Sequence, residues 1–247
     1  MTGEIVHVPH SPSTVLVRQS RFFSALPAPL LQEMAQQFRM EEWPKGIYVD
    51  PRLLMERFYI LLDGQLEMRR ANPDTGREIT LDMLYPGDSF DVVVLLDGKP
   101  HDVIVSPFTN LRLISAPIEI MRKWIWTYPE LNQQFLPYLA RKIREQEDLS
   151  ANVVLYDIST RLSRIILKHI NRISGYQGKS GDAHKDHLVN GFSDEVLARM
   201  VGSVRQVVNK HLQHWKAQGI LNKKRNQLMI KDLEALKKEA DMAESTL

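Results

Sequence analysis

Residues 192–230 read FSDEVLARMVGSVRQVVNKHLQHWKAQGILNKKRNQLMI, and this stretch indicates the fold of the C-terminal third of the chain. Ser193 is a favourable N-cap, and two acidic residues follow it in the positively polarised first turn of a helix. Gly202 then supplies the positive φ that a tight turn after that helix needs. The pattern predicts a first short helix between Ser193 and Gly202.

A second helix is expected over residues 203–216. Ser203 is interpreted as its N-cap, with Gln206 at the spacing of a capping box. Gly219 ends it, and a β-hairpin with a basic tip at residues 222–226 follows. Two short helices joined by a glycine turn and followed by a hairpin are typical of a winged helix-turn-helix.

The second helix has the chemistry of a DNA reader. Its first turns carry polar side chains that suit base edges in the major groove: Arg205, Gln206, Asn209 and Lys210. A second set suits phosphates, through two helix N-termini and the hairpin tip: Ser193, Ser203, Lys223, Lys224 and Arg225. Simpler roles stay open, since Gln206 could only cap its helix and Lys210 could only be solvated.

Charge is concentrated in the same stretch. The whole chain has a formal net charge of +2. Between Glu195 and Asp232, however, there are eight basic residues and no acidic one. Such a segment fits a polyanionic partner, although a basic solvated face is the alternative.

Upstream, residues 43–115 alternate short apolar runs with turn signals about every ten residues, which predicts a small all-β roll. A short amphipathic helix is expected over residues 21–39. A second amphipathic helix is expected over 157–173, and a polar loop over 174–187.

A long helix is predicted near residues 128–156. Within it, residues at alternating spacings of three and four form an imperfect heptad seam: Leu139, Ile143, Gln146, Ser150 and Val153. A second copy of the chain would bury this seam, and packing against the chain's own domain is the alternative. We therefore expect an α+β chain with three parts: an effector domain at 1–127, a dimerisation helix at 128–156 and a DNA-binding domain at 157–247.

The chain from about Phe22 to Ile230 resembles the CRP/FNR superfamily of bacterial transcription regulators. Residues 58–68 (FYILLDGQLEM) resemble the family's Y-I-L-x-G-x-L strand pair, and residues 84–90 (LYPGDSF) resemble its L-x-x-G-D-x-F turn. Residues 201–210 (VGSVRQVVNK) resemble its recognition helix. The resemblance implies a cyclic-nucleotide-binding-type β-roll, a homodimer, a palindromic DNA site, and RNA polymerase as a further partner.

The effector region departs from the family pattern. Asp91-Val92 stands where cAMP-binding members carry a ribose-binding Gly-Glu pair, and Asp102-Val103 stands where they carry a phosphate-binding Arg-Ser pair. A carboxylate repels a phosphate, so we expect the chain not to use cAMP. An apolar pocket for an unknown small molecule is one hypothesis, with these lining residues: Met83, Phe90, Val92 and Asp102. The simpler alternative, which the apolar residues of this region favour, is that they only form part of the core.

Composition limits cofactors and location. The chain has no cysteine, which excludes disulfides, thiolate zinc sites and cysteine-bound iron–sulfur clusters. Haem stays open through His7, His10 or His101, because no spacing singles one out. The longest aliphatic run, residues 92–96, is far shorter than the roughly 20 residues of a spanning helix. Nor does the N-terminus look like a signal peptide, so we expect a cytoplasmic protein without membrane contact.

Two other functions compete with DNA-binding regulation. One is an enzyme on a β-roll or cupin scaffold, which would need clustered His and carboxylate ligands, whereas residues 43–115 contain only His101. The other is a ligand-sensing protein that does not bind DNA. The expectation is a regulator with no catalytic residue and no metal site, whose effector, operator and sign of regulation the sequence does not name.

Overall fold

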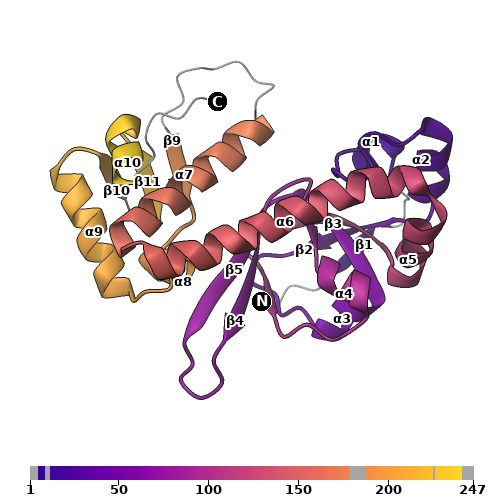
Figure 1. The fold of residues 1–247 in the computed structure, drawn as a ribbon, viewed down its shortest axis with the longest axis horizontal. Helices are drawn as coiled ribbons and strands as arrows, with labels where there is room; N and C mark the ends of the chain where they lie inside the picture. Colours follow the sequence, from indigo (N-terminus) through magenta and orange to yellow (C-terminus); the bar gives the residue numbers. More distant parts are fainter. Residues whose placement is uncertain (1–4, 9–11, 178–186, 225, 241–247) are drawn as a thin grey trace. The chain divides into compact units, whose positions relative to one another are not determined.

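The computed structural model describes residues 5–8, 12–177, 187–224 and 226–240. They form two compact units (Figure 1). Unit 1 comprises Met1–Asp74 and Leu81–Gln146, and unit 2 comprises Thr75–Thr80 and Glu147–Leu247. The predicted α+β fold is confirmed: a strand-rich N-terminal part, a long helix and a C-terminal helix-turn-helix follow one another along the chain.

The N-terminal part is built on two antiparallel sheets, ordered β1-β2-β8-β3-β6 and β5-β4-β7. The strands are β1 (Val6–Val8), β2 (Arg39–Trp43), β3 (Arg57–Asp63), β4 (Leu66–Ala71), β5 (Glu78–Leu84), β6 (Ser89–Phe90), β7 (Ile104–Pro107) and β8 (Leu111–Pro117). The helices are α1 (Thr14–Val17), α2 (Ala28–Ala35), α3 (Pro51–Glu56), α4 (Val92–Asp97) and α5 (Ile118–Thr127).

Strand β3 shows why the apolar run FYILL forms a central strand. Successive side chains of a strand point to opposite faces of its sheet. Phe58 and Ile60 accordingly belong to a core shared with residues of α2 and α5. Tyr59 and Leu61 belong to a second core inside the roll. Both faces of β3 are covered, so the strand is apolar throughout rather than alternating.

The expectation of an all-β region over residues 43–115 is wrong at two places, where α3 and α4 form. Asp50 begins α3, since its side chain accepts a hydrogen bond of 2.9 Å from the backbone N–H of Arg52. Helix α4 takes up the aliphatic run that suggested a strand. Its Val94 and Leu95 are buried in the core shared with α2 and α5, so tertiary packing overrides the β-propensity of valine.

The helix expected over residues 21–39 is also shorter than predicted. Helix α2 begins only at Ala28, with Pro27 at its N-cap and a second proline inside its first turn. A proline disfavours helical backbone in the residue before it, so the chain before Pro27 forms turns instead. Those turns bury Phe22 and Phe23 in the core.

The long helix α6 runs from Pro129 to Leu155. Leu131, Phe135 and Tyr138 near its start are buried in the core of unit 1. Figure 1 shows it as the longest helix drawn. Within the described part of the chain, no helix is long and apolar enough to cross a membrane.

Unit 2 contains a three-stranded sheet ordered β10-β11-β9 and four further helices. The elements are α7 (Ile158–Gln177), β9 (His187–Asn190), α8 (Asp194–Val201), α9 (Arg205–Ala217), β10 (Leu221–Lys224), β11 (Gln227–Ile230) and α10 (Leu233–Glu239). Helix α7 continues four residues beyond the predicted end at residue 173. Strand β9 and helix α10 are elements that the sequence pattern did not predict.

Candidate nucleic-acid interface

Helix α8 begins and ends as its sequence predicts. The Ser193 hydroxyl accepts a hydrogen bond of 3.3 Å from the backbone N–H of Val196, which makes Ser193 the N-cap. Gly202 ends the helix with a φ of 65° in the left-handed region. A side chain at that position would be strained, which is the physical reason for a glycine there.

Helix α9 starts two residues later than expected. Val204, not Ser203, occupies its N-cap position, and no side-chain cap bond forms there. The backbone N–H of Ser203 instead donates to the carbonyl of Ala198 at 2.8 Å, so Ser203 belongs to the end of α8. The first residue of α9 is therefore Arg205, at the tip that would lead into a groove.

One face of α9 is buried and the other is free. Val208, Leu212 and Trp215 are fully buried in unit 2. The predicted base readers Arg205, Gln206 and Lys210 are exposed, and Asn209 is partly buried. The buried stripe fixes the helix in place and leaves its first turns at the surface.

The wing is an antiparallel hairpin whose register pairs Leu221 with Ile230 and Lys224 with Gln227. Strand β9 adds a third strand by pairing with β11. Residues 222–224 of the stretch predicted as the basic hairpin tip belong to strand β10, with Lys224 exposed at its end. Arg225, also predicted to contact phosphate, lies outside the described residues.

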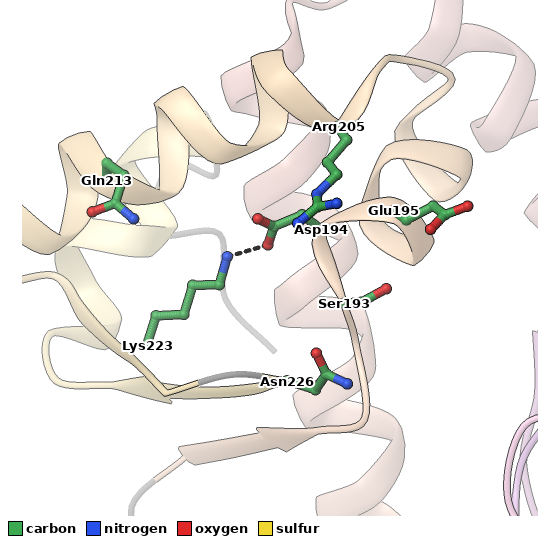
Figure 2. Close-up of a pocket in the computed structure, with 7 residues that line it drawn as sticks. All are labelled: Ser193, Asp194, Glu195, Arg205, Gln213, Lys223 and Asn226. Atoms are coloured by element: carbon green, nitrogen blue, oxygen red, sulfur yellow. Dashed lines mark hydrogen bonds and ion pairs between the residues drawn. The ribbon is translucent and has the colours of Figure 1, made fainter.

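An ion-paired cluster connects α8, α9 and the wing. Asp194 Oδ1 pairs with the Lys223 ammonium, as Figure 2 shows. Asp194 Oδ2 accepts a hydrogen bond of 2.7 Å from Asn209 Nδ2. The side chains of Asp194 and Lys223 are only 8% and 13% exposed. The cluster borders a cavity of about 570 Å³, lined by Ser193, Asp194, Glu195, Arg205, Gln213, Lys223 and Asn226.

The carboxylate at the centre of this cluster is held in its charged form. Burial raises the pKa of Asp194, but hydrogen bonds from Lys223 and Asn209 and the charges of Lys223 and Arg205 outweigh it. The net result is a pKa below the ordinary value for an aspartate. Asp194 therefore remains an anion at neutral pH, next to groups predicted to contact DNA.

The structure places Ser193, Arg205 and Lys223 around one cavity, and it gives two of the predicted DNA residues internal partners. Lys223 and Asn209 both bond to Asp194, whereas Arg205, Gln206, Lys210 and Lys224 have exposed side chains. Sequence reasoning missed Asp194 in this role, because an acidic residue in a first turn is explained by the helix dipole alone.

A second cavity, of about 280 Å³, lies in unit 1 between the roll and α6. Phe90 and Val92, two of the residues predicted to line an effector pocket, do line this cavity. Met83 is buried away from the lining. Asp102 does not line the cavity either; its side chain is 91% exposed and lies 3.7 Å from Arg70.

The cavity also contains a histidine–carboxylate pair that the sequence did not single out. His101 Nδ1 lies 2.8 Å from Asp91 Oδ1, and a carboxylate can only accept, so the nitrogen donates. Asp91 has a φ of 57°, the one positive φ among the described non-glycine residues. Lys142 on α6 faces the same cavity and pairs with Asp82 at 2.7 Å.

The described residues offer no clustered ligands for a metal. No group of three or more His, Asp or Glu side chains that could hold a metal occurs among them. His101 is committed to Asp91, His7 is exposed, and His10 lies outside the described residues. His184, in the predicted polar loop, also lies outside them.

Comparison with known proteins identifies relatives that match most of the chain. A family model described as "Crp-like helix-turn-helix domain" matches residues 160–239. The CRP-like cAMP-activated global transcriptional regulator of Mycobacterium tuberculosis is 25% identical over 229 residues, covering 91% of this chain and 98% of its own length. The global nitrogen regulator of Synechococcus elongatus is 30% identical over 159 residues, covering 64% of this chain and 69% of its own length.

A solved structure supports the fold. The c-di-GMP responsive global regulator CLP of Xanthomonas campestris superimposes with a TM-score of 0.68 at 16% identity. The match covers 83% of this chain and 99% of that one.

Proposed function

The chain belongs to the CRP/FNR superfamily of transcription regulators, which are not enzymes, and from this membership we propose a specific mode of action. The chain acts as a homodimer that binds an inverted repeat in duplex DNA through α9. A small molecule bound in the roll controls that binding. RNA polymerase is the further protein partner. The dimer acts in the cytoplasm, where it binds its operator DNA.

One observation carries the DNA-binding proposal. The first turns of α9 present Arg205, Gln206 and Lys210 to solvent, while the opposite face of the helix is buried. The planar fork of Arg205 matches O6 and N7 of guanine in the major groove, and this pairing supplies about 1–3 kcal/mol of discrimination. Lys224 on the wing has a point charge suited to phosphate, which positions the protein without reading sequence.

The dimer proposal is supported by apolar side chains that a single chain leaves exposed along α6. Leu136 and Ile143 are 62% and 59% exposed, and Val153 is 38% exposed. Ile143 and Val153 belong to the predicted heptad seam, together with Leu139, Gln146 and Ser150. Leu136 lies three residues before Leu139 and extends the seam by half a heptad towards the N-terminus. Burying this seam against a second α6 removes the exposed apolar area from water.

The effector is proposed to be a molecule other than cAMP. Asp91 lines the cavity with a side chain that is 3% exposed, and Val92 offers no hydrogen-bonding group to a ribose. The buried carboxylate of Asp91 puts a negative charge at the cavity, which disfavours an anionic ligand such as a phosphate diester. Phe90 and Val92 supply apolar surface, so the cavity favours a ligand with an apolar body.

The test is selection of duplex DNA from a random library with wild type, Arg205→Ala and Lys216→Ala. Lys216 is an exposed control at the other end of α9. Wild type and Lys216→Ala should enrich the same inverted repeat, with half-sites about one helical turn apart, and Arg205→Ala should lose preference at one base pair per half-site. A wild type that enriches no inverted repeat contradicts the proposal and favours a sensor that does not bind DNA.

A further inference from the structure

We propose that Asp194 is an intramolecular competitor for DNA phosphate: it holds Lys223 and Asn209 in the free protein and thereby suppresses non-specific DNA binding. The inference rests on the proposed DNA-binding function and adds a regulatory contact to the same surface. Below, this contact is called the Asp194 latch, meaning Asp194 with Lys223 and Asn209.

The position of Asp194 is the first argument. It is the first residue of α8, directly after the N-cap Ser193. The start of a helix has a positive partial charge and attracts anions, phosphate included. Asp194 adds a carboxylate of the chain itself to this first turn.

The partners of Asp194 are the second argument. One oxygen pairs with Lys223 on β10, a strand of the wing, and the other accepts from Asn209 on α9. Figure 2 also shows the Arg205 side chain extending from the start of α9 towards Asp194, and the charge of Arg205 contributes to the low pKa of that carboxylate. Three groups predicted to contact DNA therefore converge on one anion.

The low exposure of the pair is the third argument. Lys223 and Asp194 are both mostly removed from water, so the pair is screened less by salt than a surface pair would be. A phosphate recruits Lys223 only by breaking this contact and leaving Asp194 without its cation. That cost applies to every sequence, whereas base contacts compensate for it only at a correct site.

The consequence is a repulsive contribution to specificity. Discrimination between partners often needs an element that penalises the wrong one, and a carboxylate on a DNA-binding face is such an element. The same carboxylate also holds Asn209, which donates one N–H of its side-chain amide to Asp194. The latch therefore couples the wing to the recognition helix.

The test compares Asp194→Asn with Glu195→Gln in the full-length protein. Both changes remove one carboxylate from the same surface, but Glu195 is 73% exposed and its carboxylate lies 3.9 Å from Arg199, so it does not hold Lys223. Binding to a scrambled duplex and to the selected inverted repeat is measured by fluorescence anisotropy across a KCl series.

Release of Lys223 adds one phosphate contact per subunit. The slope of log K against log salt should then steepen by about 0.9 per subunit for Asp194→Asn. When the salt concentration is lowered from about 1 M to about 0.1 M, the affinity of this variant should therefore rise about eightfold more per subunit than the affinity of wild type. Affinity for the scrambled duplex should rise more than affinity for the inverted repeat, so the specificity ratio falls. Glu195→Gln should leave the slope close to that of wild type.

A double variant shows whether Lys223 carries the effect. Asp194→Asn combined with Lys223→Ala should return the slope to the wild-type value. An unchanged slope for Asp194→Asn, an equal effect of Glu195→Gln, or steepening that persists in the double variant overturns the inference.

Thermal unfolding, without DNA, of wild type, Asp194→Asn, Lys223→Ala and the double variant separates this inference from the proposed function. The single changes at Asp194 and Lys223 should lower Tm non-additively, and additive effects overturn the latch even if the protein reads an inverted repeat. Conversely, a wild type that binds every duplex alike, with Asp194→Asn still steepening the slope, contradicts sequence-specific function and supports the latch.

Discussion

Replacing Ile143 by aspartate should separate the proposed dimer. Ile143 lies on the α6 seam and is 59% exposed in the single chain. Fully burying an isoleucine side chain stabilises by about 1.5–3 kcal/mol, so burying its exposed part contributes roughly 1–2 kcal/mol per subunit. A symmetric pair therefore contributes about 2–4 kcal/mol to dimerisation.

The aspartate adds a second penalty to this loss. A dimer of the variant would bury two like charges near each other, and an unpaired buried charge costs several kcal/mol. Together the effects should weaken dimerisation by at least about 4 kcal/mol, which is about a thousandfold in the dissociation constant. Binding to the inverted repeat should weaken in parallel, because two half-sites are no longer read by one particle.

Sedimentation velocity at micromolar protein measures the effect directly. Wild type should sediment as a particle of twice the 28.5 kDa chain mass, and Ile143→Asp should sediment as a single chain. The control is Trp126→Asp on α5, which places the same charge at an 88% exposed aromatic residue outside the seam. A dimeric Ile143→Asp, or a Trp126→Asp variant that dissociates equally, would refute the assignment of the interface to α6.

Three further outcomes are expected. Lys224→Ala should flatten the salt dependence by about 0.9 per subunit and weaken all duplexes alike; a change in the selected sequence would contradict a phosphate role. Burial lowers the pKa of the His169 imidazole to about 4, whereas in the unfolded chain the imidazole takes up a proton near pH 6.5. The free energy of unfolding should therefore fall as the pH drops from about 6.5 to about 4, by up to about 1.4 kcal/mol per pH unit. His169→Gln should flatten that stability profile in chemical denaturation, and an unchanged profile would assign the effect to other groups. Calorimetry with cAMP should show no micromolar binding, and a micromolar affinity with tighter operator binding would refute the role given to Asp91.

The helix-turn-helix was predictable because its signals are local. Ser193 caps its helix through a bond to a residue three positions away, and Gly202 adopts the positive φ that its place between two helices requires. Ser203 shows the limit of such reasoning. A serine with Gln206 three residues on fits a capping box, yet the backbone N–H of Ser203 closes the preceding helix instead.

The parts that were missed depend on contacts between distant residues. The valine-rich run of α4 suggests a strand, but it forms a helix whose Val94 and Leu95 are buried in the core of unit 1. Asp194 meets Asn209 and Lys223 only after α8, α9 and the wing have packed together. No spacing along the sequence indicates these contacts, so the Asp194 latch could not be predicted from the sequence.

The measurement that tests the central claim most directly is titration of a selected inverted repeat, and of the same duplex with one half-site scrambled, at physiological salt. The account predicts two chains per duplex and a total preference for the selected site over fully scrambled DNA of at least about a thousandfold, with the half-scrambled duplex in between. It also predicts that Arg205→Ala lowers this preference. Equal affinity for all three duplexes, or one chain per duplex at saturation, would contradict it.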